Sequence, residues 1–393
     1  MMLRLLCLPL LLICSTGSML QQQSNPAPFT GAAQQVLRKQ ILREADWALQ
    51  QLPITVTATR AARSAGGLHD FYSEGDYWWP NPLSADSPYV QKDGMSNPAN
   101  FTAHRHAMIR FSRVTGALAA AYKITGDDRY VLHALSHYKA WCTDSATMMY
   151  PHLQYAQAIT GRFTGRGIGI IDGIQLMEAA QGMLLMEKSK RMDAVVLAGT
   201  KKWFAAFLTW LCNHPYGKDE MNAANNHGTC WVMQAAVFAK FTGNRARMEF
   251  CSNRYKNILL PRQMAEDGSF PLELKRTKAY GYSIFNLDAM ATICQVLSSP
   301  GDDLWNYETP DGKSIKKGIA YLYPFIADKT KWPLPPDVMY WKQWPVAQPF
   351  LIFGANAFNN GSWFNTWKVL DHQPGEDEVI RNLPVRHPLI WME

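Results

Sequence analysis

The sequence predicts an all-α fold built from helical hairpins, with few and short strands. From residue 31 to about residue 330, apolar residues recur every three or four positions, as on the face formed by Phe111, Val114 and Leu118. The alternation of apolar and polar residues that is typical of strands is scarce. Both observations favour a helical scaffold over a sheet.

Two segments with the same organisation indicate hairpins. In residues 120–135 and 236–251, an apolar helix ends at Thr-Gly and a new helix starts after Asp or Asn. The glycine can take the left-handed conformation that ends a helix, and the next side chain can cap the following helix. These pairs are Gly126–Asp127 and Gly243–Asn244. Hairpins in succession fit a helical bundle, a solenoid or an (α/α) toroid of inner and outer helices.

Three long segments interrupt the helical pattern, and such loops are where a binding site usually lies. Residues 66–101 are rich in Gly, Pro, Asn, Tyr and Trp, and residues 157–172 contain GRFTGRGIGIID. Residues 331–393 are rich in Pro and Trp, with short runs such as PFLIFG that we expect to be extended.

The composition is that of a globular protein with a moderately positive charge. The chain has 393 residues, of which 47% are hydrophobic and 18% charged, and its net charge is +7. A positive balance favours a polyanionic partner such as nucleic acid, acidic polysaccharide or anionic lipid. The sequence has no run of Lys or Arg and no zinc-finger spacing, so a nucleic-acid partner is not expected.

The N-terminus has the pattern of a signal peptide. Arg4 precedes an apolar run that is too short to span a bilayer, and Cys14 loosely resembles the cleavage site of a lipoprotein. We therefore expect a leader over residues 1–20, a linker over 21–30 and one domain over 31–393. The protein would then be secreted, periplasmic or attached to an outer membrane. No later segment has about 20 uninterrupted apolar residues, so no membrane span is expected.

Five cysteines follow the leader, and their surroundings predict buried free thiols. They are few, odd in number and set in apolar segments, which is not the pattern of a disulfide framework. They are Cys142, Cys212, Cys230, Cys251 and Cys294. No CxxC motif is present, so a cysteine-based metal site is not expected.

One polar cluster lies at the predicted start of a helix. Asn225, Asn226 and His227 precede an apolar helical stretch, and Glu220 lies shortly before them. Free backbone N–H groups and the helix dipole at such a position favour a bound carboxylate, and an imidazole can titrate near neutral pH. The alternative is that an asparagine only caps the helix.

A second cluster follows a predicted turn at Asp267-Gly268. The short segment DGSFPLELKR is expected to be semi-extended and ends at Arg276. A helix is expected to begin near Tyr282, with Tyr280 just before it. Arg276 and a tyrosine would then flank a junction between a loop and a helix. The alternative is an exposed arginine and a half-buried tyrosine without a function.

Aromatic and basic residues of the loops are candidates for contacts with sugar rings and carboxylates. Tyr72, Trp78 and Trp79 belong to the stretch FYSEGDYWWPNP, and they can stack on sugar rings or instead plug the end of the scaffold. The basic candidates for an anionic cleft are Arg105, His106, Arg162 and Arg166. His104 and His106 would point apart on a helix, so a metal site formed by these two residues is not expected.

Together these motifs resemble the alginate lyase family, in a divergent branch of gut-bacterial type. NNHG, followed after a helix and a turn by DGSFPLELKR and a tyrosine, has the family's order, over roughly residues 70–300. The resemblance implies an (α/α) toroid and a lyase that cleaves 4-linked uronic-acid polymers, such as alginate or glucuronan, by β-elimination without a metal or cofactor. One departure is the spacing. The family's tyrosine lies seven residues after the arginine, whereas Tyr280 and Tyr282 lie four and six residues after Arg276.

The resemblance also implies roles for individual residues. Asn226 and His227 match the family's catalytic pair, Arg276 its substrate-facing arginine and Tyr282 its catalytic tyrosine. Asn226 and Arg276 suit the stabilisation of the charge that develops at the carboxylate when the C5 proton is removed. Tyr282 would act as the acid, or as acid and base, and His227 would take the proton from the other face or carry charge. The further expected contacts to the substrate are Glu220, Asn225, Tyr280 and the loop residues named above.

Two other functions fit parts of the sequence. An (α/α) glycoside hydrolase would need two carboxylates that flank the scissile bond. Asp172, Glu178 and Glu220 are available, but no pairing is visible in the sequence. A surface protein that binds glycans without cleaving them would account for the leader and the aromatic loops. It would not account for His, Asn, Arg and Tyr in the family's order. The sequence does not predict an oligomeric state.

Overall fold

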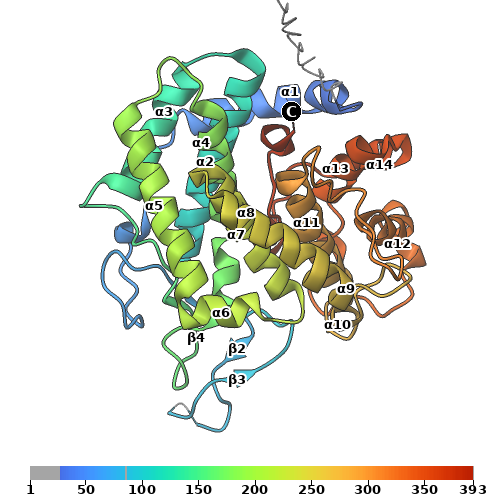
Figure 1. Ribbon diagram of the computed structural model, residues 1–393. Helices are drawn as coiled ribbons and strands as arrows, with labels where there is room; N and C mark the ends of the chain where they lie inside the picture. Colours follow the sequence, from blue (N-terminus) through green and yellow to red (C-terminus); the bar gives the residue numbers. More distant parts are fainter. Residues whose placement is uncertain (1–26, 85, 393) are drawn as a thin grey trace, which may run out of the picture.

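Helices dominate the computed structural model, which describes residues 27–84 and 86–392 (Figure 1). The predicted leader, and most of the predicted linker, lie outside these residues. The longer helices are α1 (Thr30–Ala48), α2 (Ala103–Thr125), α3 (Arg129–Tyr138), α4 (Gln175–Met186), α5 (Ala194–Asn213), α6 (Pro215–Met221), α7 (Asn226–Thr242), α8 (Arg245–Arg254), α11 (Ala279–Leu297), α12 (Ile315–Ala327), α13 (Pro349–Phe358) and α14 (Gly361–Val369). The short ones are α9 (Leu260–Gln263), α10 (Pro271–Leu274) and α15 (Asp377–Arg381).

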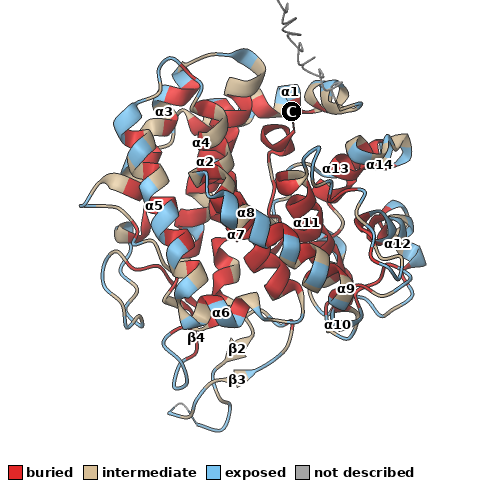
Figure 2. Ribbon diagram, viewed as in Figure 1, coloured by how far each residue is buried: buried red, intermediate tan, exposed pale blue. Residues whose placement is uncertain are grey.

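Inner and outer helices alternate along the chain. The helices α2, α4, α7, α11 and α13 are buried over most of their surface. The helices α1, α3, α5, α8, α12 and α14 bury one side and expose the other (Figure 2). A helix that is apolar all round needs neighbours on every side, whereas an amphipathic helix covers the outside. The all-α prediction is therefore confirmed, and the two layers are those of an (α/α) toroid.

The predicted hairpin turns form, with a shift of one residue at one of them. Helix α2 ends at Gly126 and α7 at Gly243, both in the left-handed conformation with φ of 70° and 71°. The side chain of Asn244 caps α8 through a hydrogen bond of 3.0 Å to a backbone N–H. Helix α3 begins one residue later than expected, after Asp128, but the side chain of Asp127 still accepts from the first backbone N–H of the helix, that of Arg129, at 2.9 Å.

Two small sheets lie at one end of the helical scaffold. Strand β1 (Tyr72–Glu74) pairs in parallel with β4 (Tyr155–Ala158), and the register shifts between the ends of β1. Strand β2 (Trp78–Trp79) pairs antiparallel with β3 (Val90–Gln91). Figure 1 shows β2, β3 and β4 beside α6. Two of the long loops predicted to carry a binding site therefore gather at this end.

One stretch that was expected to be extended is a helix. PFLIFG forms the start of α13, and Pro349 lies in its first turn, where the missing N–H of proline has no partner to lose. The run is buried against α11, α12 and α14. A continuous apolar run fits a buried strand and a buried helix equally well, so the prediction of an extended segment was wrong. DGSFPLELKR likewise contains a helical turn, α10, in place of an extended segment.

The C-terminal segment runs along the inner helices. Three glutamine side chains of α4 and α11 donate to its backbone carbonyls, each at 2.8 Å. They are Gln175, Gln181 and Gln295. The bond from Gln175 to Arg381 holds α15, and with it Asn382, at the end of the scaffold where the small sheets lie. The other two bonds hold the residues near the C-terminus.

Two helical segments, Gly167–Met186 and Ala194–Asn213, are long and apolar enough to cross a membrane by length and composition alone. The prediction of no span counted uninterrupted apolar runs, and these segments contain polar residues. The first segment is 72% buried inside the fold. The second is α5, which packs against α3 and α7. It belongs to the outer layer, and 39% of it is buried.

The five cysteines of the described residues are free, and four of them are buried. The prediction of buried thiols is therefore confirmed, with Cys212 at intermediate exposure as the exception.

Candidate active site

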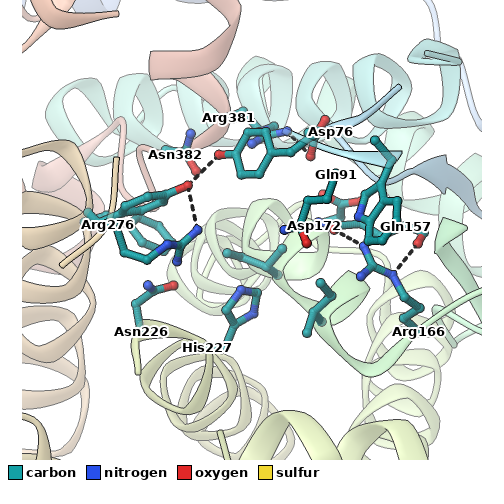
Figure 3. A pocket seen from close by; sticks show the side chains of 16 residues that line it. Asp76, Gln91, Gln157, Arg166, Asp172, Asn226, His227, Arg276, Arg381 and Asn382 are labelled. Carbon is teal, nitrogen blue, oxygen red and sulfur yellow. Dashed lines mark hydrogen bonds and ion pairs between the residues drawn. The ribbon is translucent and has the colours of Figure 1, made fainter. Parts of the chain in front are cut away.

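A cavity opens where the loops gather. Its walls come from parts of the chain far apart in sequence, namely β2 and β3, the loop after β4, the start of α7, the junction of α10 and α11, and α15. Figure 3 shows Asn226 and His227 together, with Arg276 on one side of the cavity and Arg166 on the other. Predicted residues from three separate segments therefore meet in one place.

The start of α7 carries Asn226 and His227. Asn225 precedes the helix, and its side chain accepts from the backbone N–H of His227 at 3.4 Å. Asn226 is buried, and its backbone N–H and its side-chain Nδ2 each donate to Glu273 at 2.8 Å. Burial raises the pKa of Glu273, although the bonds from Asn226 act against it. Because Glu273 belongs to DGSFPLELKR, the two motifs found in the sequence are bonded to each other.

His227 lines the cavity, and the buried Glu220 lies behind it. The Glu220 carboxylate accepts from Nδ1 of His227 at 2.7 Å, which leaves Nε2 for the cavity. Burial acts to lower the pKa of His227, but the charge and the hydrogen bond of Glu220, together with the charge of Glu273, raise the pKa above its ordinary value. Glu220 was expected to contact the substrate, and the structure makes it a partner of the histidine instead.

Tyr282 brings a hydroxyl group to the side of the cavity where Arg276 lies. This hydroxyl donates to the hydroxyl of Tyr77 at 2.8 Å and accepts from Nη2 of Arg276 at 3.3 Å. Burial, and next Tyr77, raise the pKa of Tyr282 well above its ordinary value, while Lys278 and Arg276 act to lower it. The hydroxyl is therefore protonated at neutral pH and has a polar partner on each side.

Tyr280 lies outside the cavity. It is fully buried, packs against Trp332 and Trp341, and donates its hydroxyl to the backbone carbonyl of Phe325 at 3.0 Å. Both tyrosines lie in the first turn of α11. Residues two positions apart on a helix point in different directions. The expected contact of Tyr280 with the substrate is thus replaced by a role in packing, and Tyr282 is the tyrosine that faces the cavity.

Arg276 lines the cavity, but a carboxylate already pairs with it. Its Nη2 and Nε lie 2.7 and 3.3 Å from the carboxylate oxygens of Asp93. Its guanidinium also stacks on the ring of Tyr282, 4.4 Å from the ring centre. The hydroxyl of Thr277 donates to Asp93 as well, at 3.0 Å. The loop after β3 is therefore fastened to the junction of α10 and α11.

Trp78 lines the cavity with two guanidinium groups over its ring. Arg162 and Arg166 lie 5.3 and 5.8 Å from the ring centre. Of the two, Arg166 lines the cavity, while Arg162 donates to the backbone carbonyl of Tyr89 outside it. Trp79 also lies outside, and its indole N–H donates to a backbone carbonyl at 2.9 Å. Of these candidates, the structure therefore places Trp78 and Arg166 at the cavity.

A buried network of charges forms the wall that includes α15. Arg105 lies 2.9 Å from Asp76 and 3.4 Å from Asp172. Arg381 pairs with Asp76 and, at 3.1 Å, with Glu378. Arg105 was expected to face an anionic cleft, and the structure instead buries it between two carboxylates. These two carboxylates, which belong to the same wall, pair with the charge of Arg105.

Two other candidates lie away from the cavity. Tyr72 is buried, and its hydroxyl donates to Glu74 at 2.9 Å. His106 is exposed and lies 3.5 Å from Asp377. The residue type alone does not distinguish Tyr72 and His106 from the aromatic and basic residues that line the cavity.

Several lining residues were not selected from the sequence. They are Asp76, Tyr77, Gln91, Gln157, Ile168, Ile171, Phe285, Arg381 and Asn382. Tyr77 belongs to the aromatic stretch FYSEGDYWWPNP, so it could have been selected together with Trp78. Asp172, which also lines the cavity, was considered only as the acid of a hydrolase. Arg381 and Asn382 follow no motif, and tertiary packing alone brings them to the site.

Known proteins resemble this chain in sequence and in structure. The family model described as Alginate lyase matches residues 55–332. The crystal structure of an alginate lyase from Bacteroides ovatus is 31% identical, with a TM-score of 0.78, and the match covers 92% of this chain and 96% of that chain. No curated protein sequence matches the chain.

More distant structures share the fold. Alginate lyase A1-III from Sphingomonas species A1 is 13% identical, with a TM-score of 0.53, and the match covers 83% of this chain and 89% of that chain. A variant of A1-III complexed with a tetrasaccharide is 15% identical, with a TM-score of 0.52, and the match covers 80% and 84%. The family model spans more than half of the chain and includes Asn226, His227, Arg276 and Tyr282. The chain belongs to the alginate lyase family and is a polysaccharide lyase.

Proposed function

We propose that the protein cleaves alginate by β-elimination and leaves a 4,5-unsaturated uronate at the new chain end. Glucuronan, another 4-linked polyuronate, is the second candidate substrate. One observation carries the proposal: Tyr282 faces the same cavity as Asn226 and His227, and its hydroxyl lies between Tyr77 and Arg276 at 2.8 and 3.3 Å. The relative from Bacteroides ovatus, described as an alginate lyase, supports the substrate class.

The first chemical requirement is to make the C5 proton of a uronate acidic. Its removal adds negative charge next to a carboxylate, so donors must meet that carboxylate where the charge develops. We assign this role to the amide of Asn226, which two bonds of 2.8 Å to Glu273 hold in place. Arg276 supports it from the neighbouring wall.

The second requirement is a base and an acid. The base removes the C5 proton, the electrons of that bond form the C4=C5 double bond, and the C4–O4 bond breaks as the acid protonates O4. Tyr282 suits the acid because its raised pKa keeps the hydroxyl protonated. Where the C5 proton lies on the same face as O4, Tyr282 also accepts it: the C5 proton passes to the phenol oxygen as the phenol proton passes to O4, and Arg276 and Lys278 stabilise the negative charge on that oxygen. Where it lies on the opposite face, Nε2 of His227 removes it.

The carboxylates of the cavity argue against hydrolysis. A glycoside hydrolase needs two carboxyl groups that are free to act on the bond. Asp76 and Asp172 line the cavity, but Arg105 pairs with both, and Arg381 also pairs with Asp76. Neither carboxylate is left to act as acid or base.

The test follows ultraviolet absorbance over time with purified protein on alginate and on glucuronan, in the presence of a chelator. A rise on either polymer supports elimination without a free metal ion and identifies the substrate. New reducing ends without a rise in absorbance would indicate hydrolysis and would contradict the proposal.

We also propose that the protein is exported through its N-terminal leader and is secreted, periplasmic or attached to an outer membrane, with Cys14 as the residue that would carry the attachment. This proposal rests on the sequence alone. The mass of the mature N-terminus, measured after cell fractionation, tests it. An unprocessed chain in the cytosolic fraction would contradict it.

A further inference from the structure

The arginines that line the cavity differ in whether a carboxylate of the protein pairs with their guanidinium group. Arg276 is paired with Asp93, and Arg381 is paired with Asp76 and Glu378. Within the described part of the chain, Arg166 has no carboxylate within ion-pair distance, although it lines the same cavity. An unpaired guanidinium in a cavity is a site for an anion, because its planar fork matches a carboxylate.

The surroundings of Arg166 hold it in place without neutralising it. Its Nε donates to the backbone carbonyl of Gln157 at 2.9 Å, and its Nη2 donates to the side-chain oxygen of the same residue at 3.3 Å. Gln157 has a φ of 49°, a left-handed conformation that is rare and costly for a residue other than glycine. This conformation allows one residue to offer both oxygens to one guanidinium. Strained residues of this kind concentrate at functional sites.

Burial makes the charge of Arg166 costly while the cavity is empty of anions. Burial lowers the pKa of Arg166 to about 10, and the nearest carboxylates only partly oppose this. A carboxylate that enters the cavity would therefore be attracted more strongly than by a hydrated arginine on the surface. The ring of Trp78, 5.8 Å from the guanidinium, offers an apolar face beside the same position.

The position of Arg166 decides which carboxylate it meets. In Figure 3, Arg166 lies across the cavity from Arg276, with His227 between them. The reacting uronate lies, under the proposed function, at Asn226, His227 and Tyr282. Every sugar of a polyuronate carries a carboxylate. The sugar next to the reacting one therefore brings a second carboxylate to the side of the cavity where Arg166 lies. We infer that Arg166, positioned by Gln157, binds the carboxylate of the uronate next to the one that is cleaved.

The test, which rests on the proposed function, compares Arg166→Gln with Arg191→Gln. Arg191 is exposed between α4 and α5, so its variant removes the same charge away from the cavity. On alginate we expect Arg166→Gln to raise KM about ten- to a hundredfold and to change kcat less than about threefold, because a charged hydrogen-bonding partner is lost from binding. Arg166→Lys keeps the charge without the fork and should raise KM less. Arg191→Gln should leave both constants unchanged.

The outcomes separate the inference from the proposed function. If wild-type protein forms no unsaturated product on either polyuronate, the proposed function has failed. If wild-type protein is active and Arg166→Gln keeps its KM, the inference is overturned while the proposed function stands. A fall in kcat at constant KM would place Arg166 at the reacting uronate and would also overturn it. Thermal unfolding of each variant checks the fold, and Arg166→Lys carries the test if Arg166→Gln unfolds.

Discussion

At the scale of single residues, Asn226 and His227 each depend on a buried carboxylate behind them. Glu273 holds Asn226, and Glu220 holds His227, at distances of 2.7 to 2.8 Å. Such partners fix the orientation and the charge of a reacting group without touching the substrate. A site built in this way can be tested residue by residue.

Tyr282 and Tyr280 form a matched pair for the first test. Tyr282→Phe should lower kcat about a hundred- to ten-thousandfold on alginate, since it removes the proton donor, and should leave the fold intact. Tyr280→Phe removes a buried hydrogen bond of 3.0 Å and should cost about 1 kcal/mol of stability while turnover continues. Absorbance assays and urea unfolding measure the two effects. Full activity of Tyr282→Phe would remove this tyrosine from the mechanism.

The pair of His227 and Glu220 predicts a change in pH dependence. The Glu220 carboxylate raises the pKa of His227 against the effect of burial. In Glu220→Gln that charge is absent, so the pKa of His227 falls. The limb of the profile of kcat/KM against pH that belongs to His227 should then move to lower pH. A profile that keeps its position in this variant would show that His227 does not titrate in the reaction.

At the scale of elements, helix ends position the site. The first turns of α7 and α11 carry Asn226, His227 and Tyr282. The side chain of Asn225 caps the start of α7, and Gly243 ends it in the left-handed conformation. Caps contribute a measurable part of stability because they bond N–H groups that have no partner within the helix. The same type of end recurs away from the cavity, where its energy can be measured without disturbing catalysis.

Asn244 offers this measurement. Its side chain accepts from the N–H of Arg247 at 3.0 Å at the start of α8. Asn244→Ala should lower the free energy of unfolding by about 1 kcal/mol, with kcat and KM unchanged. Asn213→Ala, at the exposed end of α5, removes an asparagine that does not cap a helix and serves as the control. Equal losses in both variants would contradict the capping role.

At the scale of the whole molecule, the C-terminal segment joins the first helix to the inner helices. His387 lies 3.1 Å from Glu44 of α1 and 3.3 Å from Glu178 of α4. Burial acts to lower the pKa of His387, but Glu178 and Glu44 raise it to about 9. Burial acts to raise the pKa of Glu44, but His387, together with Gln373 and Arg113, lowers this pKa to about 2. The charged triad is therefore present at neutral pH.

Stability should depend on pH through this triad. The pKa of His387 is above its ordinary value of 6.5, so its contribution is complete below pH 6.5 and is lost as the pH rises through about 9. The pKa of Glu44 is below its ordinary value of 4.5, so its contribution is lost as the pH falls from 4.5 to about 2. Between pH 6.5 and 9 the loss from His387 is on the order of 3 kcal/mol.

Urea unfolding at about pH 6 and about pH 9.5 measures this loss. His387→Gln should be less stable at the lower pH and should show a smaller change between the two. An equal change in wild type and variant would mean that other groups cause the pH dependence.

Local patterns account for the helices and for part of the site. Apolar periodicity and the Thr-Gly ends depend on residues within one helical turn of each other, so the hairpins could be predicted. NNHG and DGSFPLELKR were recognisable for the same reason, and they brought Asn226, His227 and Arg276 with them. Prediction failed where one pattern fits two structures, as in PFLIFG. The spacing favoured Tyr282 as the catalytic tyrosine, and Tyr282 faces the cavity, but the sequence did not show that Tyr280 is buried away from it.

The sequence by itself determined an all-α scaffold, its hairpin ends and the residues that mark the alginate lyase family, because each of these is written within a short stretch. Only the tertiary structure decided that Arg381 and Asn382 line the cavity, that Arg105 is buried in its wall and that Arg166 is left without a carboxylate. The reason is physical: the pairing of a charged side chain depends on which distant carboxylates the packed helices bring within a few ångströms of it. A local sequence pattern does not predict the distance between residues that are far apart in the chain.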